Sequence, residues 1–520
     1  MLRSSHRGHQ DGAMHRLAAV PGAPTEDDGS LPFVEQASAP VVLLSSADTD
    51  LQAVATLLEA EPELLSCPLR ALNLAALGHP AVVDHYLATT LTKTKLVVVR
   101  LLGGRGHWSY GLESLGHWRV AKPGRQLLVL AGTADEDRAL ATLGGGDEQL
   151  AMALAACLRE GGAINLRAAL RCWDALQRGS NPPPPAVVPA PDPLPHDWRD
   201  EPGARVGVIF YRALRQAGDL EPMEATLRAL RAEGLAPRGL WVSSLREGAV
   251  QEGVADLLGR EAVAAVLCGT GFASVRFEEA GLGAPLWDRL AVPVLQILCS
   301  GRSRRLWQSS SIGLGPLDLS LQVALPELDG RITTRVGAFK EQASSSASLE
   351  TALLRSVPDP ERLAWMARLT NGWIRLRQTA APQRRIGLVL ANYPTRNSRL
   401  ANGVGLDTPA SAALMLQWLQ EAGYRLSEGL DATKAPAPDR GEPAPQLPAD
   451  GDALIQALLK GRSNDPESAH RPPFDHLPLA SYLHWYGTLP QAGRKRLEEV
   501  WGEPHQDPTL ETSATGLAFP

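Results

Sequence analysis

The sequence predicts an α/β protein with several Rossmann-like domains and parallel sheets, and three observations carry this prediction. Short apolar runs without charge recur along the chain, as buried strands require. Most of them lead into a polar or glycine-rich loop and then into a segment with apolar residues at helical spacing, which is the order of a β-α unit. The length of 520 residues supplies enough material for about three domains.

The first series of such units covers residues 14–179, which we expect to form an N-terminal α/β domain. Residues 1–13 are polar and are expected to be a disordered extension, with Met14 as an alternative start of the protein. Repeated β-α units favour a parallel sheet that is buried on both faces. The expected strands are Val41–Leu44, Leu96–Leu102 and Gln126–Leu130, and a helix is expected over Leu51–Leu58.

The loop Gly103–Trp108 (GGRGHW) follows the second of these strands. Open α/β sheets bind ligands beyond the carboxyl ends of their strands, so Arg105 and His107 are candidate binding residues. A tight glycine turn explains the same residues without a ligand. An isolated histidine is also more typical of a packed or solvated side chain than of a metal ligand. Both interpretations stay open for this loop.

A proline-rich stretch, Ser180–Asp200, separates the first series from a second one. Its proline density favours extended polyproline structure over helix or sheet, and we expect a semi-rigid linker there. Residues 201–380 then form the expected second α/β domain. Four β-α units favour a doubly wound sheet. The expected strands are Val206–Tyr211, Leu240–Val242, Ala262–Leu267 and Val292–Leu298, with a helix over Glu221–Glu233.

Two carboxylates, Glu327 and Asp329, follow an apolar approach within Ser320–Ile332. The apolar residues of this approach alternate up to Pro326 as they would in a strand. We expect such surroundings to desolvate Glu327 in part, which would suit a group that accepts protons near neutral pH. The alternative interpretation is a solvated acidic turn with no chemical role.

Residues 381–520 begin a third α/β domain that we expect to be incomplete. A buried strand is expected at Ile386–Leu390, followed by a polar loop over Asn392–Asp407 and a helix with Pro409 in its first turn. Arginines in this loop can reach carboxylates, and glycines let the backbone approach a ligand closely. An ordinary strand–loop–helix crossover is the alternative. The candidate substrate-binding residues of the loop are Asn392, Arg396, Arg399, Asn402, Gly403 and Gly405.

Composition and missing motifs exclude several functions. The net charge of -6 argues against a nucleic-acid binder. The chain has no GxxxxGK[ST] loop for ATP, and its CGTG sequence lacks the GxGxxG form of a dinucleotide site. Five widely spaced cysteines offer no zinc framework and fit a reducing compartment. No apolar run approaches the roughly 18 residues of a membrane span, and the first residues lack a signal peptide core, so we expect a cytoplasmic protein.

Several motifs, taken together and in order, resemble those of the family formed by CobN and the large subunit of magnesium chelatase. They are LVVVRLLGGRG, CGTGFAS, VALPELDGRI and the sequence NYP, then R, then NGVGLDTPAS over Asn392–Ser411. The resemblance covers nearly the whole chain after Met14. The ending TGLAFP resembles the start of a family strand that leads into several hundred more residues. We therefore expect the chain to be the N-terminal part of a truncated subunit.

The resemblance implies the porphyrinoid-binding large subunit of a cobaltochelatase, a ligase that forms nitrogen–metal bonds. Such a subunit inserts Co²⁺ into hydrogenobyrinic acid a,c-diamide in cobalamin biosynthesis, while two AAA+ partner subunits use ATP and Mg²⁺ that this chain does not bind. Glu327 and Asp329 are then the catalytic candidates, with Glu327 as base or transient metal ligand. Arg396 and Arg399 would meet carboxylates of the macrocycle.

Two other functions stay open at this stage. The first is that of the magnesium chelatase large subunit, which would insert Mg²⁺ into protoporphyrin IX, although the NYPTRNSRLANGVGLD loop favours the cobalt side. The second is a non-catalytic α/β binding module with two lobes and a linker.

Overall fold

A computed structural model describes most of the chain and divides it into two compact units, Met1–Ile374 and Arg375–Pro520. Each unit is described by itself. The described residues are 33–134, 137–275, 285–391, 401, 403, 405–426, 448–462, 466–468, 470–471, 473, 475–507, 510–511 and 516–519.

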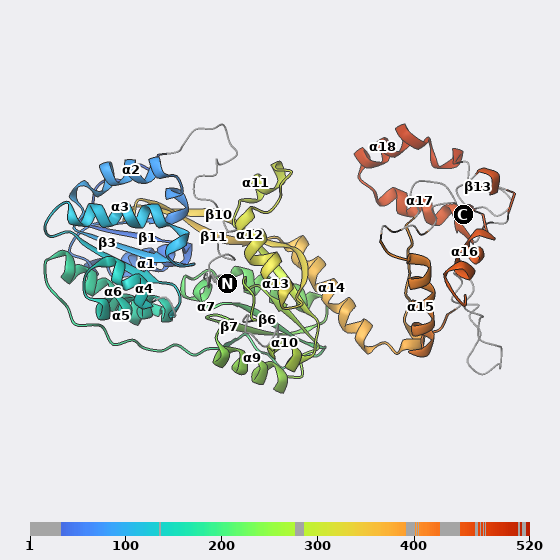
Figure 1. Ribbon diagram of the computed structural model, residues 1–520, viewed down its shortest axis with the longest axis horizontal. Helices are drawn as coiled ribbons and strands as arrows, with labels where there is room; N and C mark the ends of the chain where they lie inside the picture. The colour runs from blue at the N-terminus through green and yellow to red at the C-terminus, as the bar shows by residue number, and fades with distance from the viewer. Residues whose placement is uncertain are drawn as a thin grey trace, which may run out of the picture. The chain divides into compact units, whose positions relative to one another are not determined.

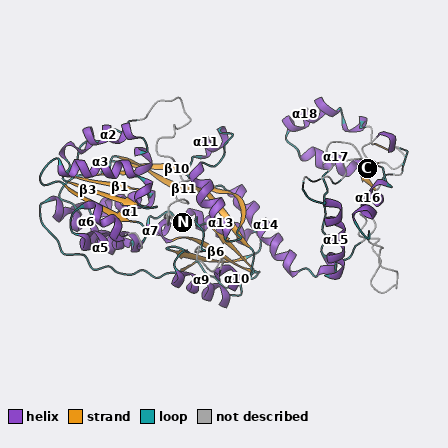
Figure 2. Cartoon of the chain, viewed as in Figure 1, coloured by secondary structure: helices purple, strands orange, loops and turns teal. Residues whose placement is uncertain are grey.

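The first unit opens with a four-stranded parallel sheet in the order β2-β1-β3-β4, which confirms the predicted fold class. Its strands are β1 (Val41–Ser45), β2 (Leu69–Asn73), β3 (Leu96–Leu101) and β4 (Gln126–Ala131). Helices cover both faces of this sheet (Figures 1 and 2). They are α1 (Asp48–Ala60), α2 (Pro80–Thr89), α3 (Ser109–Val120), α4 (Asp137–Gly144), α5 (Glu148–Glu160) and α6 (Gly162–Gln177).

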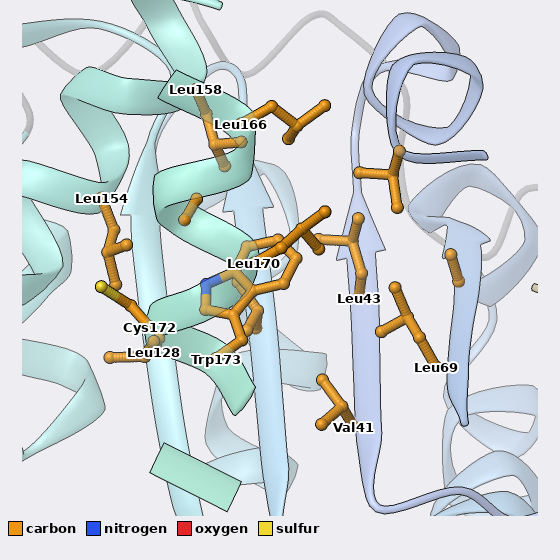
Figure 3. Packing of buried hydrophobic residues seen from close by; sticks show 14 of the residues in the cluster. Val41, Leu43, Leu69, Leu128, Leu154, Leu158, Leu166, Leu170, Cys172 and Trp173 are labelled. Atoms are coloured by element: carbon orange, nitrogen blue, oxygen red, sulfur yellow. The ribbon is translucent and has the colours of Figure 1, made fainter. Parts of the chain in front are cut away.

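The alternation of side chains along β1 builds a separate core on each face of the sheet. Val41 and Leu43 pack with residues of α1, α5 and α6, whereas Val42 and Leu44 pack with residues of α2 and α3. Val41 and Leu43 point towards Trp173 of α6, which lies fully buried between helix and strands (Figure 3). Burial on both faces explains why each of these strands is a continuous apolar run in the sequence.

The second sheet of the first unit has seven strands in the order β11-β10-β9-β8-β6-β7-β5. Strands β6 to β10 run parallel to their neighbours, while β5 and β11 are antiparallel edges. The strands are β5 (Leu194–His196), β6 (Arg205–Tyr211), β7 (Ala236–Val242), β8 (Ala265–Cys268), β9 (Val294–Ser300), β10 (Ile332–Ser346) and β11 (Thr351–Pro358). The helices around it are α7 (Arg212–Gln216), α8 (Glu221–Ala232), α9 (Gly248–Arg260), α10 (Pro285–Leu290), α11 (Arg304–Ser309) and α14 (Pro360–Gln378).

The predicted doubly wound sheet is confirmed, but one expectation about the proline-rich stretch is wrong. Residues 194–196 lie inside the expected linker and nevertheless form β5, which pairs with β7. Pro195 is compatible with this strand because β5 lies at the edge of the sheet, where proline removes no hydrogen bond that the sheet needs. The stretch therefore ends as part of the second sheet.

The hairpin of β10 and β11 ties the two sheets of the first unit together. Leu349, in its turn, is fully buried in the core formed by α1, α5 and α6. The backbone of Ala71 donates to the carbonyl of Leu349 at 3.2 Å, and Arg70 pairs with Glu350 at 2.7 Å. Lys340 of β10 also pairs with Asp48 at 3.3 Å. The two sheets therefore pack as parts of one unit.

The described residues of the second unit form a small antiparallel sheet, in the order β12-β14-β13, and, beyond the end of α14, four α-helices. The strands are β12 (Asp475–Pro478), β13 (Leu510–Glu511) and β14 (Gly516–Phe519), and the helices are α15 (Thr408–Glu421), α16 (Gly451–Leu459), α17 (Leu479–Thr488) and α18 (Gln491–Trp501). Asp407 caps α15, because its carboxylate accepts from the backbone of Ala410 at 3.0 Å.

The predicted buried strand at 386–390 is wrong. These residues have no regular structure, and the side chains of Ile386 and Val389 are 55% and 93% exposed. A strand needs a neighbouring strand for its backbone hydrogen bonds, and the described part of the chain pairs none with this run. Leu414 and Trp418 of α15 are exposed as well.

Candidate functional site

The carboxyl-terminal edge of the second sheet is the place where the fold brings two sequence motifs together. Strands β6 and β8 are neighbours there, while the chain continues from them to opposite sides of the sheet. This is the switch point at which open α/β sheets bind ligands. Tyr211, the last residue of β6, donates from its hydroxyl to the carbonyl of Gly271 at 2.9 Å, and Gly271 belongs to the CGTGFAS loop after β8.

The second motif, VALPELDGRI, begins on a continuous helical segment, Pro316–Leu328, which we call the rod (Figure 1). It consists of α12 (Pro316–Leu319), a π-helical turn (Ser320–Ala324) and α13 (Leu325–Leu328). The expected strand-like approach to Pro326 is therefore wrong. A proline inside an α-helix clashes with the carbonyl four residues earlier, and the wider π turn in front of Pro326 relieves this clash.

Hydrogen bonds hold the rod across the ends of β8 and β9. The backbone of Phe272, after β8, donates to the carbonyl of Leu321 at 2.7 Å. The side-chain amide of Gln322 donates to the carbonyl of Cys299 and accepts from its backbone, both at 2.6 Å. The rod is thus fixed to the loop after β8 and to the end of β9, at the carboxyl edge of the sheet.

Asp329, at the end of the rod, has a fully buried carboxylate. It accepts from the backbone and the hydroxyl of Ser274, both at 2.7 Å, and from the backbone of Val275 at 3.0 Å. It also pairs with Arg331 at 2.7 Å, and both side chains have no exposed surface. The ring nitrogen of Trp287 lies 3.5 Å from the same carboxylate as a fifth donor, so protein groups satisfy this buried charge.

Arg331 connects the carboxylate to the CGTG sequence. Its guanidinium donates to the carbonyl of Thr270 at 3.0 Å, to the side-chain oxygen of Gln296 at 3.1 Å and to the sulfur of Cys268 at 3.4 Å. The guanidinium also lies 5.4 Å from the ring centre of Trp287. The pair of Asp329 and Arg331 therefore locks the PELDG turn onto the loop after β8.

Glu327 is placed differently from the sequence expectation. Its side chain is exposed, and one carboxylate oxygen accepts from the hydroxyl of Thr333 at 2.9 Å. The expectation of partial desolvation is thus wrong for Glu327, because the buried carboxylate is that of Asp329. Gly330 follows α13 in the left-handed conformation, with φ at +73°. It separates Asp329 from Arg331, whose side chains are both buried. Glu327 stands on the solvent side of this turn.

The rod carries a further carboxyl group that sequence reasoning missed. Asp318 accepts from the backbone of Gly301 at 2.7 Å and from the amide of Gln322 at 3.1 Å. Burial raises the pKa of Asp318 above its ordinary value. The only sequence signal was its place in front of VALPELDG, since PLDLS contains no recognisable motif.

The cysteine nearest to the rod is Cys299, near the carboxyl end of β9. Burial raises the pKa of Cys299 to about 12, so its thiol stays protonated at neutral pH. Metals bind the thiolate form. Within the described ranges, no group of three or more histidine, cysteine, aspartate or glutamate side chains is arranged to hold a metal ion.

The GGRGHW loop lies at the corresponding switch point of the first sheet, where β3 is the neighbour of β1. Gly103 and Gly104 have φ values of +94° and +72°, which only glycine adopts easily. Arg105 is exposed, and burial lowers the pKa of the half-buried His107, so this histidine is neutral at pH 7. Arg105 and His107 follow a strand of the first sheet, whereas Glu327 lies on α13 beside the second sheet.

The polar loop of the second unit is described only in part. Asn392, Arg396, Arg399 and Asn402 lie outside the described residues. Gly405 has φ at +76°, and a Cβ atom on Gly403 would lie 2.6 Å from the hydroxyl of Thr408 at the start of α15. Close packing in front of α15 therefore accounts for Gly403 without a ligand.

The fold and the joined motifs define an α/β chain whose candidate site lies at the carboxyl edge of a doubly wound sheet. Comparisons with known proteins agree. The sequence profile described as CobN/Magnesium Chelatase matches residues 155–519. The chain therefore belongs to the CobN/magnesium chelatase family. Across the described parts of both units, no helix is long and apolar enough to cross a membrane.

Individual relatives carry the same family name. The chain is 36% identical over 510 residues to the aerobic cobaltochelatase subunit CobN of Pseudomonas aeruginosa, with 95% of this chain and 39% of that protein covered. It is 34% identical over 528 residues to the protein of the same name from a Sinorhizobium species, with 97% and 39% covered. The chain thus spans about two fifths of the length of these relatives.

A solved structure supports the fold. The catalytic subunit of cobaltochelatase from Mycobacterium tuberculosis aligns with 92% of this chain and 37% of its own, at a TM-score of 0.53 and 27% sequence identity.

Proposed function

We propose that this chain forms part of the porphyrinoid-binding large subunit of an ATP-dependent cobaltochelatase, which inserts Co²⁺ into hydrogenobyrinic acid a,c-diamide. The observation that carries the proposal is the PELDG turn, where an exposed Glu327 stands on a support of buried residues joined by an ion pair and hydrogen bonds. The two cobaltochelatase relatives, at 36% and 34% identity, support cobalt as the metal.

The reaction requires a group such as Glu327. Insertion of a divalent metal into a tetrapyrrole releases two pyrrolic protons and strips water from the ion. A solvent-facing carboxylate can accept such a proton or hold Co²⁺ briefly, since oxygen donors bind this metal without trapping it. Contact with the macrocycle would then desolvate Glu327 in the complex, a change that raises a carboxyl pKa.

Asp329 has a positioning role in this proposal. Its carboxylate has no exposed surface and accepts hydrogen bonds from Ser274, Val275 and Arg331, so it offers no accessible oxygen to a proton or to a metal ion. It keeps the turn that carries Glu327 in one geometry, and preorganised geometry of this kind is what chemistry at a site needs.

Other parts of the chain and its partners complete the proposed reaction. Arg396 and Arg399, together with Asn392 and Asn402, would bind carboxylates at the rim of the macrocycle. Arg105 and His107 are secondary binding candidates on the first sheet. ATP hydrolysis with Mg²⁺ would come from two AAA+ partner subunits, since this sequence contains no phosphate-binding loop.

The test replaces Glu327 by glutamine in an assembled enzyme. The homologous region of the Pseudomonas aeruginosa relative is exchanged for this chain, and cobalt insertion is assayed with the partner subunits and ATP. Glu327→Gln should retain tetrapyrrole binding and lose on the order of 100-fold in insertion rate, the scale of lost general-base catalysis. Full activity of this variant would show that Glu327 is only a solvated turn residue.

The same preparation separates the family's two chemistries. Supplying Mg²⁺ and protoporphyrin IX in place of Co²⁺ and hydrogenobyrinic acid a,c-diamide should give no insertion. Faster insertion of Mg²⁺ than of Co²⁺ would assign the chain to the magnesium chelatase side instead.

A further inference from the structure

A small cavity lies at the carboxyl edge of the first sheet, whereas the PELDG turn lies beside the second sheet. Its lining residues come from the start of α1, the end of β3, the turn between α5 and α6, and α7. Its volume of about 50 Å³ exceeds the roughly 10–15 Å³ that one water molecule requires, but a tetrapyrrole does not fit into it. Any occupant is therefore a small molecule or ion, and not the substrate of the proposed function.

Arg100 lines this cavity from the switch point of the first sheet. It lies on β3 level with Ser45, the last residue of the neighbouring β1. The chain continues from β1 into α1 and from β3 into α3, and these two helices pack on opposite faces of the sheet. Open α/β sheets bind ligands at such a point. Arg100 therefore stands where a ligand of the first sheet is expected.

The guanidinium group of Arg100 is buried but only partly paired. The residue is 9% exposed, and Nη1 donates to the carboxylate of Asp50. Nε is buried without a hydrogen-bond partner, and Nη2 donates to no other described residue. Two adjacent N–H groups of a guanidinium bind an oxyanion through two parallel hydrogen bonds. The described residues thus leave one such edge of a buried cation unused, at a cost in free energy that a ligand would remove.

The start of α6 supplies further donors to the same cavity. Gly161 and Gly162 line it, and no side chain caps the helix that begins there. Their φ values are +62° and +76°, a conformation that glycine adopts easily. The first backbone N–H groups of a helix have no partner inside the helix and carry a partial positive charge. These groups favour an anion over a cation or a neutral ligand.

The charged side chains around the cavity are compatible with an anion. Among the described lining residues the one carboxylate is that of Asp50, and its charge is compensated by Arg100. The second arginine of the lining, Arg159, is held by Asp137 through two hydrogen bonds of 2.6 Å. No uncompensated negative charge therefore opposes an anion among these residues.

We propose that this cavity binds a small oxyanion of the class of inorganic phosphate. Two oxygens of the anion would accept from Nε and Nη2 of Arg100, and the start of α6 would face the remaining charge. The lining also includes Ala213 and Gln216 of α7, which follows β6 of the second sheet. A bound anion would therefore contact elements of both sheets. The proposal does not depend on the proposed function.

The experiment is a calorimetric titration of the purified 520-residue chain with sodium phosphate, at an ionic strength held constant with sodium chloride. Arg100→Lys keeps a positive charge beside Asp50 but removes the unused edge. Ala213→Glu adds a carboxylate at an exposed position on the α7 side of the cavity. Ala88→Glu is the matched control, because Ala88 is exposed on α2, which packs on the opposite face of the first sheet from α1. Circular dichroism checks that each variant is folded.

The wild type should bind one phosphate per chain. Arg100→Lys should raise the dissociation constant by about 10-fold or more, the scale of a lost charge-assisted contact. Ala213→Glu should raise it by roughly 5-fold, because its carboxylate repels the anion. Ala88→Glu should bind phosphate as the wild type does. Sodium acetate should bind more weakly than phosphate, since it carries one charge and has only two oxygens.

Several results would overturn the proposal. A wild-type chain that binds no phosphate would show that water molecules occupy the cavity. Unchanged affinity in a folded Arg100→Lys variant would place the phosphate elsewhere. If Arg100→Lys does not fold, the comparison of the two glutamate variants decides, because equal affinities of Ala213→Glu and Ala88→Glu would mean that the anion does not bind beside α7. Tighter binding of acetate than of phosphate would refute phosphate as the ligand class.

Discussion

Replacement of Asp329 by asparagine probes the buried pair that supports the PELDG turn. The substitution keeps the size of the side chain but removes its charge, so Arg331 remains buried with no ionic partner. Two backbone donors, from Ser274 and Val275, also lose a charged acceptor. Breaking one side of a buried pair costs about 3–5 kcal/mol, because the remaining charge is left uncompensated.

This cost translates into a measurable change in thermal stability. A unit of the size of Met1–Ile374 has an unfolding entropy of about 0.8 kcal/mol/K from the usual value per residue. The unfolding midpoint of the first unit should therefore fall by about 4–6 °C, measured by calorimetry or circular dichroism. Glu327→Gln is the matched control, because its exposed side chain makes only one hydrogen bond, and its midpoint should stay within about 1 °C of the wild type.

A double variant separates charge from packing. In Asp329→Leu/Arg331→Met, both charges are gone and apolar groups fill the space, so its loss of stability should be smaller than that of Asp329→Asn. An unchanged midpoint for Asp329→Asn would refute the conclusion that the pair supports the turn. A double variant less stable than the single one would show that hydrogen bonds, and not the uncompensated charge, set the cost.

Three further predictions concern other groups. The raised pKa of Asp318 means that the folded state binds the proton of this carboxyl group more tightly than the unfolded state does. The contribution of Asp318 to the free energy of unfolding should therefore decline as pH rises above 3.8. Asp318→Asn should remove this decline, which denaturant unfolding measured from pH 4 upward would show. The lowered pKa of His107 should appear as an NMR titration midpoint below 6.5, and a midpoint at or above 6.5 would contradict its half-buried position. The purified chain should bind no ATP in equilibrium dialysis, and micromolar binding would contradict the proposed division of labour with AAA+ partners.

Much of the α/β fold was predictable because buried parallel strands leave an unmistakable pattern. Strands such as β3 and β6 are apolar over most of their length, since both faces of the sheet are covered. In the first unit, the strands that escaped prediction are β10, which is rich in polar residues although it lies inside the second sheet, and β2, β5 and β11, which lie at sheet edges. There Arg70, Pro195 and Arg355 interrupt the apolar pattern without harm, because one side of an edge strand needs no partner.

The sequence alone pointed to the PELDG turn as a site, through its pair of carboxylates and its family resemblance. It did not determine which carboxylate would be buried. That outcome depends on Arg331 and on the loop after β8, which lies more than 50 residues earlier in the chain. The assignment of burial to Asp329 and exposure to Glu327 is therefore a property of the tertiary structure.

The run at 386–390 is a second case in which the sequence did not determine burial. Its apolar composition predicts a buried strand by every local rule, yet Ile386 and Val389 are exposed. Local sequence determines which segments are able to be strands and helices, because backbone preferences and apolar periodicity act over a few residues. Burial, and with it the environment of each catalytic candidate, depends on distant segments that only the folded chain brings alongside.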